Sequence, residues 1–207
     1  MRAALLALFV FAAPPVWCGE DILDVLDRSQ HQQLDALELA DPGSPEAQRV
    51  QRSFEQLLPL VTLPVRVRLQ FVRGSKVAEC LLGRIIVVNV SLADLSEGER
   101  LFVLAHELGH VAHGHWSAMG RLFQKHIPDE VVRHKTDAVA GALGREASAL
   151  AHEQEYAADA YAWSVLARVG ESRETALALF HTLPMVNDTA THPGTRKRVA
   201  HLRALTQ

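Results

Sequence analysis

Two histidines and a glutamate stand at a spacing that suits metal-assisted hydrolysis. They form the run His106-Glu107-Leu-Gly-His110. Residues four apart on a helix share a face, so both imidazoles can reach one zinc ion while Glu107 projects toward the water on that ion. The apolar residues at 103–105, 108 and 111 indicate a helix buried almost all round. Buried histidines need partners, and a metal ion supplies one, so the run predicts a zinc site.

A catalytic zinc ion usually takes three protein ligands, so a third must be found. His113 lies on the same helix stripe, but seven residues of helix rise ~10 Å, which is too far for one ion. Trp116 stands where the metzincin pattern needs its third histidine, which excludes that arrangement. Glu155 and Asp159 are four apart on an alanine-rich stretch, so one can bind zinc while the other accepts a ligand histidine's second N–H. Glu153 is a weaker alternative ligand. The alternative without a metal is that Glu155 and Asp159 simply form part of an exposed acidic helix face.

The elements that must position these side chains are mostly helices. Ser96 followed by Glu99 fits a capping box, so the helix that carries the two histidines should begin there. An alanine-rich helix is expected over 147–167, and period-two patterns predict strands. We therefore expect an α+β fold that is mainly helical, with a small sheet whose edge strand borders the active-site helix. The remaining expected elements are a helix or helical hairpin at 21–39, helices at 45–58, 174–183 and from 195, and strands at 65–71, 76–82 and 84–90, the last being the expected substrate-facing edge.

The segment 116–145 joins the two metal-binding helices and is longer than a connection requires. It contains Pro128 and three glycines as helix breakers. Connections of this kind are often active-site lids, and an ordinary packed helical pair is the alternative. As a lid, it would turn its apolar residues to the cleft, and His126, His134 or His192 could occupy the metal's open position. The apolar residues in question are Leu122, Phe123, Ile127, Val131 and Val132.

Composition and the N-terminus bound the class of protein. The chain has 207 residues and a net charge of −3, which favour one globular domain and disfavour nucleic-acid binding. A basic start, an apolar run and a Pro14-Pro15 break predict a signal peptide at 1–18 and an exported, periplasmic protein. Lipidation of Cys18 is less favoured because bulky Trp17 precedes it. No later apolar run reaches membrane-spanning length, so we expect a soluble exported protein with no transmembrane segment in the mature chain. A single domain is expected over 19–207, with N-terminal helices at 19–60 and the catalytic core at 61–207.

Three blocks in order resemble a known family. They are the His106 run, Glu155-Tyr-Ala-Ala-Asp159, and His192-Pro193 followed by Arg198. Together they resemble the gluzincin peptidases that include HtpX and the CAAX prenyl protease, in a soluble exported branch. The resemblance implies one Zn²⁺ per chain. It also implies a role for each matched residue: His106, His110 and Glu155 as zinc ligands, Glu107 as general base, and Asp159 as the carboxylate behind a ligand. His192 and Arg198 are expected as further catalytic residues near metal and substrate, where either could stabilise the oxyanion.

The chain departs from the family at 76–84, where many members carry an Asn-Ala-Phe-Ala segment and paired glycines. This departure puts in doubt the substrate specificity of the strand that faces the substrate, and it does not affect the metal site. The resemblance implies a zinc endopeptidase that acts on polypeptides of the exported or envelope fraction, in protein quality control. A zinc-stabilised chaperone or assembly factor of the cell envelope, with latent or lost peptidase activity and envelope-protein partners, is the alternative.

Overall fold

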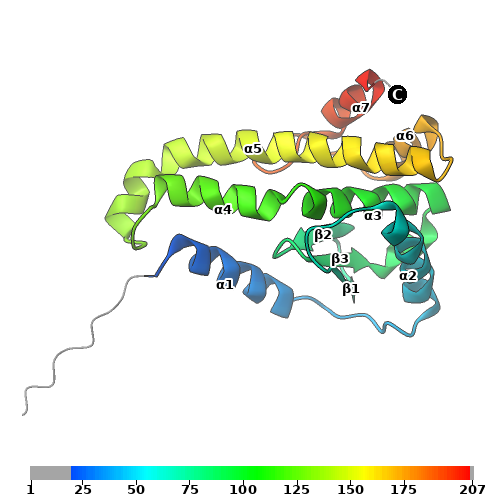
Figure 1. Ribbon diagram of the computed structural model, residues 1–207, viewed down its shortest axis with the longest axis horizontal. Helices are drawn as coiled ribbons and strands as arrows, with labels where there is room; N and C mark the ends of the chain where they lie inside the picture. The colour runs from blue at the N-terminus through cyan, green and yellow to red at the C-terminus, as the bar shows by residue number, and fades with distance from the viewer. Residues whose placement is uncertain (1–19, 206–207) are drawn as a thin grey trace, which may run out of the picture.

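A computed structural model describes residues 20–205, and within them the chain folds into helices around one small sheet (Figure 1). The expected α+β class, mainly helical, is confirmed. The expected signal peptide lies outside the described residues. The α-helices are α1 (Ile22–Asp35), α2 (Pro45–Leu57), α3 (Glu97–Ala112), α4 (His115–His126), α5 (Arg133–Arg168), α6 (Arg173–Thr182) and α7 (Thr195–Ala204), with 3-10 turns η1 (Leu58–Leu60) and η2 (Val90–Asp94).

The longest element is α5, whose 36 residues span about 54 Å. Figure 1 shows α3 and α4 lying end to end beside it, with α1 below α4 and the sheet below α3. The expected helix at 147–167 is therefore only the second half of a longer one, because the alanine-rich pattern continues without a break back to Arg133. Among the described helices, none is both long enough and apolar enough to cross a membrane.

The sheet has three strands in the order β1 (Arg68–Val72), β3 (Ile85–Asn89), β2 (Ala78–Leu81). β1 runs parallel to β3, and β2 runs antiparallel to it. All five residues of β3 are buried. The expectation that 84–90 is the edge strand is thus wrong: continuous β-branched residues mark a strand covered on both faces and both sides, and β2 is the edge that borders α3.

Helix α3 is held at its start and packed along its length. Ser96 accepts from the amide of Glu99, and the Glu99 side chain accepts from the amide of Ser96, as the capping box predicts. Glycines let neighbouring helices approach: a Cβ at Gly98 would overlap Thr175 of α6, and one at Gly109 would lie 3.2 Å from the Cα of Ala158 of α5. Close approach to α5 fixes the distance between the two groups of predicted metal ligands.

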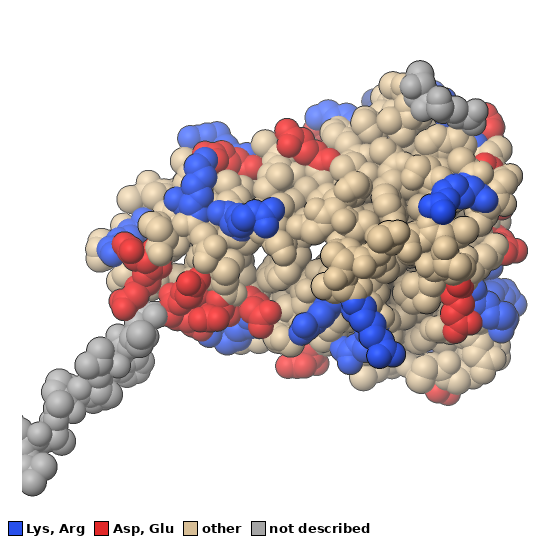
Figure 2. Space-filling view, in the orientation of Figure 1, with Lys and Arg blue, Asp and Glu red and all other residues tan. Residues whose placement is uncertain are grey.

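The surface carries both signs of charge. Figure 2 shows acidic side chains gathered where α1 begins, and lysines and arginines dispersed over the rest of this face. On α1 the acids include Asp24 and Asp27, and Arg28 pairs with Glu20 just before the helix. Such a surface has no single-sign field on this face that would steer a polyanion.

Candidate metal centre

Helices α3 and α5 bring together the three predicted zinc ligands. One ligand atom from each of His106, His110 and Glu155 lies within 4.8 Å of the other two. Nε2 of His106 lies 3.5 Å from Oε2 of Glu155, and Nε2 of His110 lies 3.4 Å from its Oε1. Glu153 is exposed and outside this cluster. The three side chains that were predicted as ligands therefore meet at one point, with Glu155 and not Asp159 facing the Nε2 atoms of the histidines.

Asp159 lies behind the cluster. Its Oδ1 is 2.9 Å from Nδ1 of His106, and it is fully buried. Arg198 of α7 donates from Nε to Oδ2 at 2.8 Å and from Nη2 to Oδ1 at 2.5 Å. Burial alone would raise the pKa of Asp159, but the bonds from Arg198 outweigh burial and lower it. The carboxylate is therefore charged and fixes the orientation of the His106 ring.

The cluster has the chemistry of a zinc site. Oε2 of Glu155 is buried and has no hydrogen-bond partner within residues 20–205. The Nε2 atoms of His106 and His110 face each other at 3.2 Å, although two unprotonated ring nitrogens cannot bond to each other. Burial would raise the pKa of Glu155, but the charge of His106 outweighs it and lowers that pKa. Two imidazole nitrogens and a carboxylate turned to one point are the donor set that zinc prefers, so the residues fit the ion.

A cavity of about 620 Å³ opens at this cluster. Helix α3 forms one wall with His106, Glu107 and His110, and the strand β2 forms another. Glu107 is 6% exposed, and burial raises its pKa. Cys80 of β2 also lines the cavity, where burial first and the charge of Glu107 second raise its pKa and keep it a thiol. The carboxylate of Glu107 thus borders both the predicted ligands and a space that a peptide could enter.

The outer edge of β2 faces this cavity. The amide of Asn89 donates to the carbonyl of Val77, and bonded pairs alternate along an antiparallel ladder, so Ala78 and Cys80 direct their backbone groups away from β3. Beyond them, the amide of Leu82 donates to the side chain of Gln30 from α1. The open edge is therefore short, and α1 closes one end of it.

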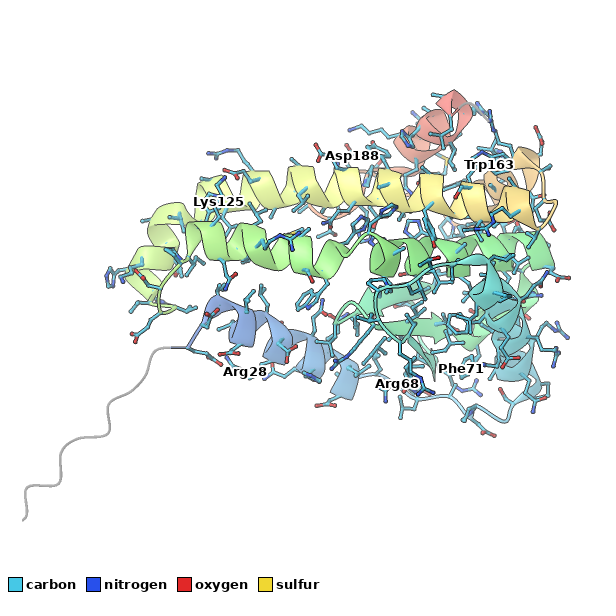
Figure 3. The ribbon with its side chains drawn as sticks, in the orientation of Figure 1. Arg28, Arg68, Phe71, Lys125, Trp163 and Asp188 are labelled. Carbon is cyan, nitrogen blue, oxygen red and sulfur yellow. The ribbon has the colours of Figure 1, made fainter. Side chains whose placement is uncertain are left out.

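The segment between α6 and α7 places His192 at the mouth. Asp188, labelled beside α5 in Figure 3, accepts from the amide of Gly194 at 2.6 Å and pairs with Lys197. Nε2 of His192 lies 3.6 Å from Oε1 of Glu155, and burial lowers the pKa of the ring. His192 thus lies near Oε1 of Glu155 and Arg198 near its Oε2. Both residues line the cavity, and Arg198 is also tied to Asp159.

The prediction of a lid at 116–145 is wrong. No residue of this segment, all of which the structure describes, lines the cavity. Nε2 of His126 lies 3.2 Å from Glu146, and His134 is exposed on α5. The segment is the packed alternative: its apolar side chains meet α1, which no local pattern could indicate. The residues of this packing are Ile22, Val25, Leu26, Leu122, Phe123, Ile127, Val131, Val139 and Leu143.

Two features of the site were missed from the sequence. His115 is buried, with Nδ1 2.9 Å from Nδ1 of His110, and burial first and the neighbouring imidazoles second lower its pKa to about 3. The sequence feature that could have indicated His115 is its position directly after Gly114, the glycine that ends the helix carrying His106 and His110. Gln30 and Gln33 of α1 line the cavity, and Gln33 donates to Glu79 at 2.6 Å. Nothing in their local sequence relates α1 to the sheet.

The chain resembles a solved structure in fold. It matches the crystal structure of S. mikatae Ste24p with a TM-score of 0.54 and 19% sequence identity. The match covers 87% of this chain and 56% of that one, so the chain spans little more than half the length of that relative. A search of curated proteins finds no match.

Residues 44–206 match peptidase family M48, which is well over half of the chain. The matched range contains all seven predicted site residues, which are His106, Glu107, His110, Glu155, Asp159, His192 and Arg198. The chain belongs to peptidase family M48, a family of zinc-dependent metallopeptidases.

Proposed function

We propose that the chain is a zinc endopeptidase that holds one ion with His106, His110 and Glu155 and uses Glu107 as its general base. The observation that supports this most is the meeting of three ligand atoms within 4.8 Å at the wall of a cavity that also contains Glu107. When bound there, zinc supplies Lewis acidity toward the attacking water and the scissile carbonyl. Glu107 takes a proton from the water and returns one to the leaving amine.

The other residues of the site orient the ligands and the substrate. Arg198 directs two of its three nitrogens to Asp159, and its Nη1 lies 3.5 Å from Oε2 of Glu155. We therefore assign Arg198 a positioning role and not that of an oxyanion donor. His192 faces the mouth with more than half of its side chain exposed. It is the group placed to donate to the substrate's carbonyl oxygen, or to close the site at rest.

The geometry of β2 bears on the substrate class. Its outward backbone groups at Ala78 and Cys80 offer an edge on which an extended chain adds as a further strand. Main-chain pairing of this kind requires a segment without secondary structure of its own. Together with the predicted signal peptide, this supports unfolded polypeptides of the exported or periplasmic fraction as substrates, and protein quality control as the role.

The test compares Glu107→Gln with wild type, using Glu97→Gln as the matched control on an exposed turn of the same helix. An unfolded protein such as casein is the substrate, new termini are read by mass spectrometry, and zinc is counted by elemental analysis. We expect one zinc per chain in all three proteins and cleavage lowered by about 10²–10⁴-fold only in Glu107→Gln. Undiminished cleavage by Glu107→Gln would remove Glu107 from the mechanism.

The chaperone or assembly factor alternative predicts another outcome in cells. A strain that lacks the gene would be complemented as well by Glu107→Gln as by wild type, while a variant without zinc would fail. Complementation by wild type and by Glu97→Gln alone would support the peptidase.

A further inference from the structure

His115 lies against a predicted zinc ligand from the side away from the cavity. It is 8% exposed, and its Nδ1 is 2.9 Å from Nδ1 of His110. The two rings meet edge to face with centroids 4.9 Å apart. Two ring nitrogens at this distance form a hydrogen bond only when one of them carries the proton, so one ring must donate and the other accept.

The direction of this bond follows from the other nitrogen of His110. Nε2 of His110 faces Nε2 of His106 at 3.2 Å and Oε1 of Glu155 at 3.4 Å, so it is the atom turned to the ligand cluster. A ring nitrogen that binds a metal carries no proton, and a neutral imidazole then carries its proton on the other nitrogen. Nδ1 of His110 is therefore the donor, and Nδ1 of His115 is the acceptor.

The backbone is shaped to bring His115 to this place. On an unbroken helix, residues five apart are separated by about 140° around the axis, so the two rings could not meet. Gly114 has φ +61°, which interrupts the helix between the end of α3 and the start of α4, so the spacing of a continuous helix no longer applies across it. The carbonyl of His115 then accepts from Nε2 of the buried Gln154, the residue before Glu155 on α5. The ring is thus fixed between the two helices that carry the ligands.

We propose that His115 is a positioning residue for the metal centre, whose Nδ1 accepts the Nδ1–H of His110 and so fixes that ring's tautomer and orientation. The inference rests on the proposed zinc site. The two histidine ligands would then have different hydrogen-bond partners behind them. His106 is oriented by the carboxylate of Asp159, which Arg198 holds, and His110 is oriented by the neutral imidazole of His115. Partners of this kind change metal affinity by about 10–100-fold when they are removed.

The experiment measures zinc affinity by chelator competition in wild type and three variants. His115→Leu keeps an apolar side chain of similar bulk but no acceptor, and should weaken binding by about 10–100-fold. His115→Asn places an amide oxygen close to the position of Nδ1, and should recover most of that loss. The matched control is His113→Ala, because His113 stacks on His115 at 5.4 Å and contacts neither His106, His110 nor Glu155 in the described hydrogen bonds. Its affinity should match wild type.

A second measurement separates orientation from packing. In the metal-free protein, ¹⁵N spectra of the histidine rings report which nitrogen of His110 carries the proton. We expect the Nδ1–H form in wild type and His115→Asn, and a mixture of forms in His115→Leu. Equal loss of affinity in the Leu and Asn variants, or wild-type affinity in His115→Leu, would overturn the proposal. If wild type itself fails to bind zinc, the proposed function fails and not this inference alone.

Discussion

Gly109 sets the separation of α3 and α5, so replacing it with alanine tests how tightly the metal centre depends on that separation. The glycine lies between His106 and His110. A Cβ there would lie 3.2 Å from the backbone Cα of Ala158 and 3.2 Å from two side-chain carbons of Tyr161. Carbon atoms prefer separations of about 3.5–4.0 Å, so α5 must move by roughly 0.3–0.8 Å, because a backbone atom cannot turn aside.

Two opposing contributions decide the stability of Gly109→Ala. Overpacking of a close contact costs about 1–3 kcal/mol. Alanine in place of glycine inside a helix returns about 0.8–1.0 kcal/mol. The net change in the free energy of unfolding is therefore a loss of about 0–2 kcal/mol. Zinc binding should suffer more visibly, because Glu155 is one turn from Ala158 and ligand distances tolerate only about ±0.2 Å.

We expect Gly109→Ala to lower zinc affinity by on the order of 10-fold, the lower end of what disturbing a ligand's orientation costs. Denaturant unfolding of the metal-free protein and chelator competition measure the two effects separately. Gly144→Ala is the control, because nothing lies within 4 Å of its Cβ position on α5. It should gain up to about 1 kcal/mol and keep its zinc affinity. A Gly109→Ala variant as stable as this control, with unchanged zinc affinity, would refute the reasoning.

Three further predictions concern the same core. Glu155→Ala should lose zinc and Glu153→Ala should keep it, and elemental analysis that shows full occupancy in Glu155→Ala would exclude that ligand. Asp159→Ala should weaken zinc binding by about 10–100-fold and destabilise the metal-free protein by up to about 3–5 kcal/mol, as measured by competition and denaturation, because it leaves the guanidinium of Arg198, whose side chain is only 19% exposed, without its main partner. Gly98→Ala should destabilise by about 1–3 kcal/mol, and Thr175→Ala should restore part of this loss; additive effects in the double variant would exclude the overlap of the two side chains.

How much of the site could be predicted depends on whether the signal is local. Ser96 and Glu99 fix the start of α3 through bonds across three residues, so the sequence was enough to locate it. Helical spacing placed His106 with His110 for the same reason. His115 was missed because its position depends on the left-handed backbone of Gly114, which turns the chain by an amount that spacing rules do not include.

Contacts between segments that are distant in the sequence were harder to predict. The central place of β3 depends on parallel pairing with β1 across the β2 hairpin, and no residue of either strand encodes that partner by itself. The apolar residues of 116–145 predict a buried face, and the structure buries that face against α1 and not in the cleft. An amphipathic pattern indicates that one face of a helix is buried, but it does not indicate which other element packs against that face.

The short edge of β2 also has a consequence for the protein's own solubility. An open strand edge is a template on which other sheets can assemble, and proteins usually protect it. Here the strand has only four residues, charged Lys76 and Glu79 lie at its start, and Gln30 occupies the amide just past its end. A single extended chain can pair along such a recess, whereas the long flat edge of another folded sheet finds too few free backbone groups. The same shortness that confines a substrate thus guards against self-association.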